Sequence, residues 1–294
     1  MKSYRFISYV SDFFIYFIVL IFSVFCIAPF IIVLSASFTS EAGLLRHGYT
    51  LFPVEVSLEA YAMIFKNGLT IARSYIVSII ITVTGTIMAV IITTGAAFCL
   101  ANKQVKYRNT LAFYFFFTML FSGGLVPWYL ICTQLGLRDN IYALIVPTLM
   151  FNAFNMFLVR NYMLGIPVSL MESAKIDGAN DFVIAFKIYF PLSVPVIAAI
   201  TMFYALGYWN DWWNAIMLVD DSKLYPLQYF LFKLQSEVQM LRDLRGLTGG
   251  SIKAPPTESL RMATAIVTTG PIVLLYPFLQ RYFIKGLVIG SVKG

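Results

Sequence analysis

The sequence predicts an all-α membrane protein with six transmembrane helices, and its composition and its apolar segments both support this fold class. Hydrophobic residues make up 60% of the 294-residue chain, charged residues only 12%, and the mean hydropathy is +0.80. Average globular proteins carry about twice that share of charge, so an ordinary soluble domain is excluded. Six apolar stretches are each long enough to cross about 30 Å of hydrocarbon. They are residues 13–34, 74–100, 109–133, 140–160, 188–210 and 262–282.

The six stretches are expected to be helices rather than β-strands. A segment in hydrocarbon must satisfy its own backbone hydrogen bonds, and these stretches lack the alternation of apolar and polar residues that membrane strands show. The first stretch follows Lys2 and Arg5, as a signal peptide would. Its apolar core is longer than the roughly 7 to 15 residues of a signal peptide, so we expect a retained span. We treat residues 1–294 as one transmembrane domain.

Positive charge predicts which side of the membrane each loop faces. The short connector between the second and third stretches holds Lys103, Lys106 and Arg108, and connectors of this kind face the cytoplasm. Both termini are then cytoplasmic, and the long segments 35–73 and 211–261 face outward. The net charge of +7 fits this topology, and no feature indicates nucleic-acid binding.

The cysteine and histidine content predicts no cofactor or metal site. Cys26, Cys99 and Cys132 all lie in apolar stretches and form no C-x-x-C pair. The single histidine, His47, has no neighbouring cysteine. The sequence therefore supports neither a redox motif nor a zinc site.

A short polar segment lies in the loop 161–187, between the fourth and fifth stretches. Ser169 and Glu172 have the S-x-x-E spacing of a capping box, which predicts that a helix starts near Leu170. Gly178 can supply the left-handed residue that ends this helix after about two turns. A second short helix is expected to begin around Asn180.

This segment resembles the EAA loop of permease subunits in binding-protein-dependent ATP-binding-cassette importers. Glu172, Ser173 and Ala174 stand at the EAA positions and Gly178 at the glycine, with Ser173 a mild departure from the pattern. The resemblance is closer to carbohydrate permeases of the MalG type, particularly the LplC/YtcP branch. The further motifs that carry it are Phe121-Ser122-Gly123-Gly124, Pro191-Leu192-Ser193-Val194-Pro195, Trp209-Asn210, Pro226-Leu227-Gln228 and Lys285-Gly286.

The resemblance implies a type I importer permease in the bacterial cell membrane, without enzymatic activity of its own. The implied partners are a second, non-identical permease subunit, two ATPase subunits that use ATP and Mg²⁺, and an extracytoplasmic solute-binding protein. The implied substrate is an oligosaccharide, and the LplC/YtcP branch suggests an acidic one. The segment 285–294 implies a second contact with the ATPase, although a solvated tail fits the sequence equally well.

The chain needs an external source of energy for transport. It contains no G-x-x-x-x-G-K-[ST] loop for ATP phosphates and no ionisable residue in the middle of a span. We therefore interpret the loop helix as the element that docks to an ATPase, with Glu172 pairing with a basic partner residue or only completing its own capping box. The candidate coupling residues are Leu170, Met171, Glu172, Ser173, Ala174, Asp177, Gly178 and Ala179.

Polar and aromatic residues in and near the fourth and fifth stretches are candidates for the solute path. Sugar rings stack on aromatic rings, and their hydroxyl groups bind amides and carboxylates. The tryptophans also fit an anchoring belt at the membrane interface, and the asparagines also fit hydrogen bonds between helices. The candidates are Asn152, Asn155, Tyr204, Tyr208, Trp209, Asn210, Asp211, Trp212 and Trp213.

Two other functions remain open at this point. An importer permease for a solute other than sugar is disfavoured only by the matches to carbohydrate permeases. A stand-alone carrier or a membrane enzyme needs clustered His, Asp or Glu side chains at membrane depth, and the sequence offers no such cluster.

Overall fold

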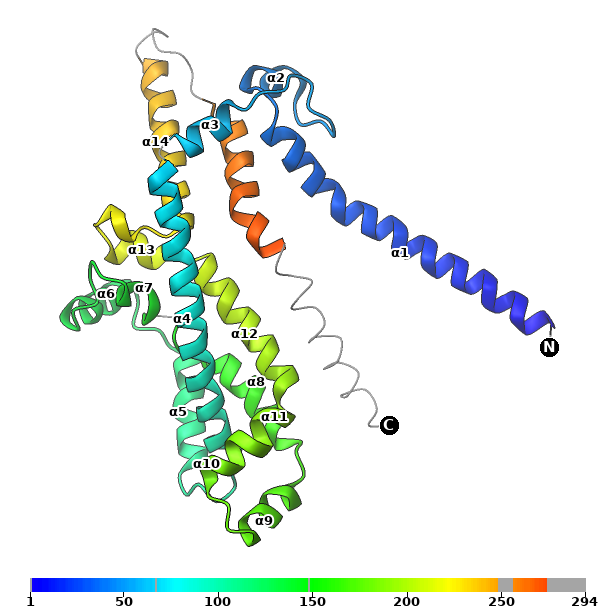
Figure 1. Ribbon diagram of the computed structural model, residues 1–294, viewed down its shortest axis with the longest axis vertical. Coiled ribbons are helices and arrows are strands. Elements are labelled where there is room, and N and C mark those ends of the chain that lie inside the picture. The colour runs from blue at the N-terminus through cyan, green and yellow to red at the C-terminus, as the bar shows by residue number, and fades with distance from the viewer. Residues whose placement is uncertain (1, 67, 148, 248–255, 274–294) are drawn as a thin grey trace. The chain divides into compact units, whose positions relative to one another are not determined.

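The computed structural model describes residues 2–66, 68–147, 149–247 and 256–273, and these residues are almost entirely helical. The only β pairing among them is an isolated bridge between Thr39 and Val56, so the all-α class is confirmed. The chain forms two compact units (Figure 1). Unit 1 contains Met1–Gly68 and Leu231–Pro271, and unit 2 is built on Leu69–Phe230.

Unit 1 contains the first expected span. Helix α1 (Lys2–Ser37) is apolar from Asp12 onward, and its most apolar 18-residue stretch is not buried within the chain, whereas Ser35, Ala36 and Ser37 at its end are buried. Its exposed aliphatic and aromatic side chains suit contact with lipid or with another membrane helix. The other helices of the unit are α2 (Glu41–His47), α3 (Glu59–Phe65), most of α14 (Leu227–Leu247) and a helix over residues 258–273, called the capped helix below.

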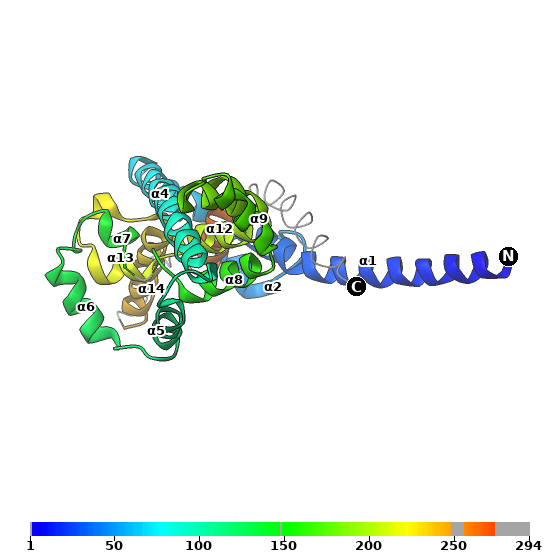
Figure 2. The ribbon, with the colours of Figure 1, turned by 90° about the horizontal axis from the view of Figure 1, so that it is seen from below.

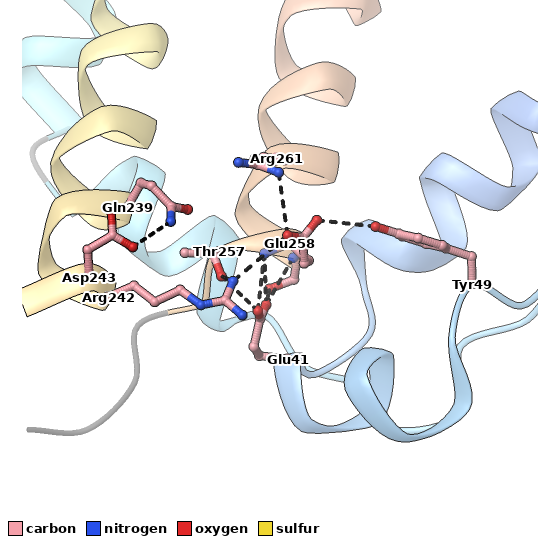
Figure 3. A network of polar contacts seen from close by, with 9 residues as sticks. Glu41, Tyr49, Gln239, Arg242, Asp243, Thr257, Glu258 and Arg261 are labelled. Atoms are coloured by element: carbon pink, nitrogen blue, oxygen red, sulfur yellow. Dashed lines mark hydrogen bonds and ion pairs between the residues drawn. The ribbon is translucent and has the colours of Figure 1, made fainter. Parts of the chain in front are cut away.

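A network of polar contacts joins α2 to the start of the capped helix (Figure 3). The carboxylate of Glu41 accepts hydrogen bonds from the backbone N–H groups of Glu258 (3.0 Å) and Ser259 (3.1 Å) and from the hydroxyl of Thr257 (2.9 Å). The first N–H groups of a helix have no partner within it and favour a negative charge. Arg242 of α14 donates to Thr257 Oγ1 at 2.6 Å. Glu41 therefore caps a helix that lies more than 200 residues away in sequence.

Unit 2 is organised around α4 (Gly68–Ala101), which carries the second expected span. One buried core packs α4 against α8 (Ala153–Leu164) and α12 (Val194–Trp209), which lie side by side in Figure 2. The close approach depends on Gly85, because a Cβ atom there would lie 2.4 Å from Cζ of Tyr208. The shorter helices α13 (Trp213–Leu218) and η2 (Ser222–Leu224) belong to the same unit.

The third expected span, residues 109–133, is not one helix, so that prediction is wrong. It forms α5 (Arg108–Leu120) and α6 (Leu125–Gln134), whose axes differ by 117°. Gly124 lies between them with φ of +84° and ψ of 178°, a conformation open essentially to glycine alone. The Phe-Ser-Gly-Gly motif is therefore a sharp turn that ends α5.

The fourth expected span, residues 140–160, is also interrupted. It forms α7 (Tyr142–Ile145) and α8, with non-helical residues between them. Pro147 supplies no backbone N–H with which to continue α7. Asn152 has extended backbone angles and accepts a hydrogen bond from the N–H of Asn155 at 3.1 Å, so it starts α8 as an N-cap.

The fifth expected span, residues 188–210, is helical but bends by 83° at Ser193. Pro191 and Pro195 flank the bend, and neither supplies a backbone N–H to the helical ladder. The sixth expected span begins in the capped helix and continues beyond the described residues. The segments before the bend are α10 (Asp181–Ile184), the π-helical η1 (Ala185–Tyr189) and α11 (Phe190–Leu192).

Two helices in the described part of the chain are individually long and apolar enough to cross a membrane. They are Asp12–Ser37 and Gly68–Ala101. The number rises to four if α5 and α6 together form one bent span and the helical segments on the two sides of Ser193 form another. The sequence pattern thus locates the apolar segments correctly but not the breaks within them.

The carboxylate of Glu41 should make the stability of the protein depend on acidic pH. Burial raises the pKa of Glu41, but hydrogen bonds from Ser259, Glu258 and Thr257 outweigh burial and hold the pKa below its ordinary value. This stabilisation is present above the ordinary glutamate pKa and is lost as the pH falls through the lowered one. Glu41→Gln should reduce the free energy of unfolding by about 1 kcal/mol at pH 7 and flatten its dependence on acidic pH.

Thermal unfolding of the purified protein in detergent between pH 7 and pH 3 measures both effects. Glu237→Gln, on the exposed surface of α14, is the matched control and should leave the profile unchanged. Equal profiles for wild type and Glu41→Gln would show that the cap does not contribute to stability.

Candidate functional site

The polar segment between the fourth and fifth expected spans forms the short helix α9 (Val168–Ile176). The helix begins two residues earlier than expected, with Pro167 at the N-cap and no side-chain hydrogen bond to the first turn. The predicted capping box of Ser169 and Glu172 is therefore wrong, because Ser169 already lies inside the helix. The second short helix begins as predicted, since Asn180 caps α10 by accepting from the N–H of Val183 at 2.9 Å.

The end of α9 is fixed by Gly178, as the sequence predicts. Gly178 has φ of +81°, in the left-handed region that favours glycine. The N–H of Ala179 donates to the carbonyl of Ala174 at 2.9 Å, and the N–H of Gly178 donates to that of Lys175 at 3.0 Å. This pair of bonds is a Schellman motif, which satisfies carbonyls that a helix end leaves without partners.

The side chains of α9 divide into a buried face and an exposed face. Met171 is only 4% exposed and belongs to the main core of unit 2, against which Ala174 and Ala179 also pack. Met171 was expected among the residues that meet a partner, but burial makes it an anchor of α9 instead. The exposed residues of α9 and its C-cap are Val168, Ser169, Leu170, Glu172, Ser173, Ile176 and Asp177.

Ile176 is a feature of this surface that the sequence analysis missed. Its side chain is 87% exposed, which is unusual for an isoleucine in a soluble loop. The signal was present in the sequence, because Ile176 follows Glu172 by four residues and Ser173 by three and so shares their face of the helix.

Lys175 ties α9 to its neighbours in unit 2. Its ammonium group lies 3.2 Å from the carboxylate of Asp181 and donates a hydrogen bond to Gln104 Oε1. Gln104 lies in the connector after α4, and the backbone N–H of Gln104 donates a hydrogen bond to Asn102 Oδ1 at 3.0 Å. At the same end of the unit, Arg160 Nε donates to the carbonyl of Leu100 at 3.3 Å. Figure 1 shows α9 at this end of unit 2, beyond α8 and α10.

Three of the solute-path candidates meet in one cavity of about 390 Å³ in unit 2. Asn152, Asn155 and Tyr204 line it, together with apolar and aromatic side chains that the sequence did not single out. We call it the α8–α12 cavity. Its other lining residues are Leu149, Phe154 and Phe203.

The polar groups of this cavity are held at fixed positions. The hydroxyl of Tyr204 accepts from the backbone N–H of Asn152 at 3.0 Å and lies 2.7 Å from Thr93 Oγ1. Asn152 Oδ1 is occupied as the cap of α8. The side chain of Asn155 is only 7% exposed, and its amide makes no hydrogen bond within the described part of the chain. Asn155 thus offers a donor and an acceptor to the cavity.

The other candidates do not line this cavity. Tyr208 donates to the carbonyl of Ile145 at 2.8 Å and packs over Gly85. Trp209 is buried. Asn210 donates to the carbonyl of Leu206 at 2.9 Å and has contacts outside the cavity. These residues therefore hold the end of α12 in place.

Asp211 and the neighbouring tryptophans likewise have structural contacts. Asp211 accepts hydrogen bonds from the backbone N–H of Trp213 (3.1 Å) and of Asn214 (3.2 Å), and it caps α13. Burial raises the pKa of Asp211, while the bonds from Asn214 and Trp213 act in the opposite direction. The rings of Trp212 and Trp213 are edge to face at 5.7 Å and exposed. In the described residues, no group of three or more His, Cys, Asp or Glu side chains is arranged to hold a metal ion.

Comparison with known proteins assigns the family. Residues 95–289 match the model of the binding-protein-dependent transport system inner membrane component. The chain is 42% identical to the polygalacturonan/rhamnogalacturonan transport system permease protein YtcP of Bacillus subtilis, covering 96% of this chain and 98% of that protein. It is also 42% identical to the protein LplC of the same organism, over 91% of this chain and 90% of LplC.

A solved structure has the same fold. It is a chain of a bacterial ABC transporter involved in the import of the acidic polysaccharide alginate, with a TM-score of 0.77, 30% identity, and coverage of 96% of this chain and 98% of that one. The family match covers most of the sequence and includes α9, the α8–α12 cavity and α14. The chain belongs to the family of inner membrane components of binding-protein-dependent transport systems.

Proposed function

We propose that this chain is a permease subunit of an ATP-driven importer of acidic oligosaccharides. The observation that carries the proposal is the match along almost the whole chain to a permease named for polygalacturonan and rhamnogalacturonan transport. The fold of an alginate importer supports the same class of substrate, since alginate is described as an acidic polysaccharide. Sugar chains of this class combine carboxylates with hydroxyl groups and apolar ring faces.

Coupling to ATP hydrolysis is assigned to α9. The exposed side chains of Leu170 and Ile176 offer an apolar contact to a partner, with Glu172 available to a basic partner residue. Met171 and the Schellman motif at Gly178 fix this surface to the core of unit 2. A push on α9 is then transmitted to the helices behind it.

The proposed assembly contains this chain, a second and non-identical permease, two ATPase subunits and an extracytoplasmic solute-binding protein. ATP and Mg²⁺ belong to the ATPase subunits, since the sequence of this chain has no phosphate-binding loop. The chain is proposed to cross the bacterial cell membrane several times with both termini in the cytoplasm, as the positive connector at Lys103, Lys106 and Arg108 indicates.

The α8–α12 cavity is proposed as part of the solute path. Its lining carries no charged side chain, so it suits the hydroxyl groups and ring faces of a sugar better than its carboxylate. Asn155 supplies the hydrogen-bonding groups, and Phe154 and Phe203 supply aromatic surface.

Affinity purification of the full chain from its native membrane in mild detergent tests the proposed function. We expect a second permease and an ATPase to co-purify, and the reconstituted complex to hydrolyse ATP faster when the binding protein and an oligogalacturonate are added. Purification of the chain alone, with transport activity unaided by ATP, would contradict the proposal.

Replacing Asn155 tests the solute path. Asn155→Leu keeps the side-chain size but removes the donor and the acceptor, so uptake of oligogalacturonate by the reconstituted complex should fall about threefold to tenfold. The matched control is Asn161→Leu, at an exposed position of the same helix, which should transport normally. Equal uptake by both variants at equal protein amounts would exclude a role for the cavity.

A further inference from the structure

Unit 1 contains a groove of about 510 Å³ that none of the assigned roles uses. One side of α14 forms most of its lining, and Arg261 of the capped helix supplies the rest. We call it the α14 groove. Its lining residues are Phe232, Gln235, Ser236, Gln239, Met240, Asp243, Leu244 and Arg261.

The spacing of the lining residues explains how one helix builds this groove. The seven residues from α14 are separated alternately by three positions and by one, so all of them lie on a single face. The face is mixed in character. Phe232, Met240 and Leu244 are apolar and exposed, whereas Gln239 and Asp243 between them are polar.

The polar side of the groove is held in place by the Glu41 network (Figure 3). Glu41 fixes the first turn of the capped helix, and Arg261 projects from its second turn with its guanidinium 3.4 Å from the carboxylate of Glu258. The Arg261 side chain is 51% exposed, so donors of the guanidinium remain accessible to a ligand. On α14, Gln239 donates to the carboxylate of Asp243 at 3.0 Å.

We propose that the α14 groove binds a uronate residue of the transported oligosaccharide, an inference that rests on the proposed function. The ring of Phe232 is 40% exposed and packs against the apolar face of the sugar ring. Gln239 and Asp243 bind its hydroxyl groups, and the guanidinium of Arg261 binds its carboxylate. The uncharged α8–α12 cavity lacks such a cation, so recognition of the acidic group is assigned to unit 1.

The chemistry of the groove favours a sugar over a packed protein helix. A helix seated on this face would desolvate Gln239, Asp243 and Arg261, and burying a charge without a full set of partners is costly. A sugar ring instead presents several hydroxyl groups beside an apolar surface and can satisfy these side chains while covering Phe232.

The test uses two probes with the same sugar backbone, the charged trigalacturonate and its uncharged methyl ester. Binding of each is measured by saturation-transfer NMR on the complete membrane complex without the binding protein, so that the binding protein makes no contribution. Arg261→Gln should weaken binding of trigalacturonate about tenfold and that of the ester less than twofold, because only the acid loses a charge-assisted contact. Arg261→Lys should restore part of the loss.

Phe232→Ala should weaken both probes, since stacking does not depend on the carboxylate. Two matched controls on α14 lie outside the groove lining, Lys233→Gln for the charge and Leu241→Ala for the apolar surface, and both should bind as wild type does.

Three results would overturn the inference. If Arg261→Gln weakens the acid and the ester equally, Arg261 only holds the capped helix. If Arg261→Gln and Phe232→Ala both bind trigalacturonate normally, the sugar does not occupy the groove. The same conclusion follows if the wild-type complex binds neither probe while the full system imports trigalacturonate. In both cases the proposed function stands. Failure of the full system to import either compound overturns the proposed function itself.

Discussion

The packing of Met171 into the core of unit 2 is the interaction that connects α9 to the helices behind it. Met171 is the side chain of α9 that is buried in this core, and Ala174 and Ala179 pack against the same core at its edge. Met171 lies in the same core cluster as Ile184, Ile200 and Tyr204, so α9, α10 and α12 share one packed interior. Packed interiors are dense and shift as units rather than deforming smoothly. In the proposed function, this shared core is the route by which a force on the exposed face of α9 would reach the α8–α12 cavity.

The breaks in the apolar segments have a common consequence. Membrane helices tolerate non-helical backbone only where protein or a polar cavity covers it. The break before α8 places the backbone N–H of Asn152 against the hydroxyl of Tyr204, and it brings the amide of Asn155 to the cavity wall. The same interruption that removes a continuous fourth helix therefore creates the polar part of the cavity. Unit 1 carries the charged side chains of the Glu41 network, among them Glu41 and Arg261.

Local signals in the sequence predicted the elements whose causes are local. Gly178 ends α9 and Asn180 starts α10 because single residues determine these backbone conformations. The capping box failed because Pro167 starts the helix earlier, and propensity alone does not decide between two nearby starts. The roles of Asp211 and Met171 were missed because they depend on partners that only the folded chain brings together. Asn155 and Tyr204 were identified by type, but their meeting in one cavity required the structure.

The most direct test measures the rate of sugar uptake and the rate of sugar-stimulated ATP hydrolysis by the reconstituted complex with Ile176→Asp in α9. Burying an isoleucine side chain in a partner is worth about 1.5 to 3 kcal/mol, and a carboxylate at the same place removes this contribution. We expect Ile176→Asp to stay in the membrane but uptake and sugar-stimulated ATP hydrolysis to fall about tenfold or more, and Ile176→Val to be close to wild type. Wild-type rates of uptake and of sugar-stimulated ATP hydrolysis in Ile176→Asp would show that α9 does not carry the coupling contact.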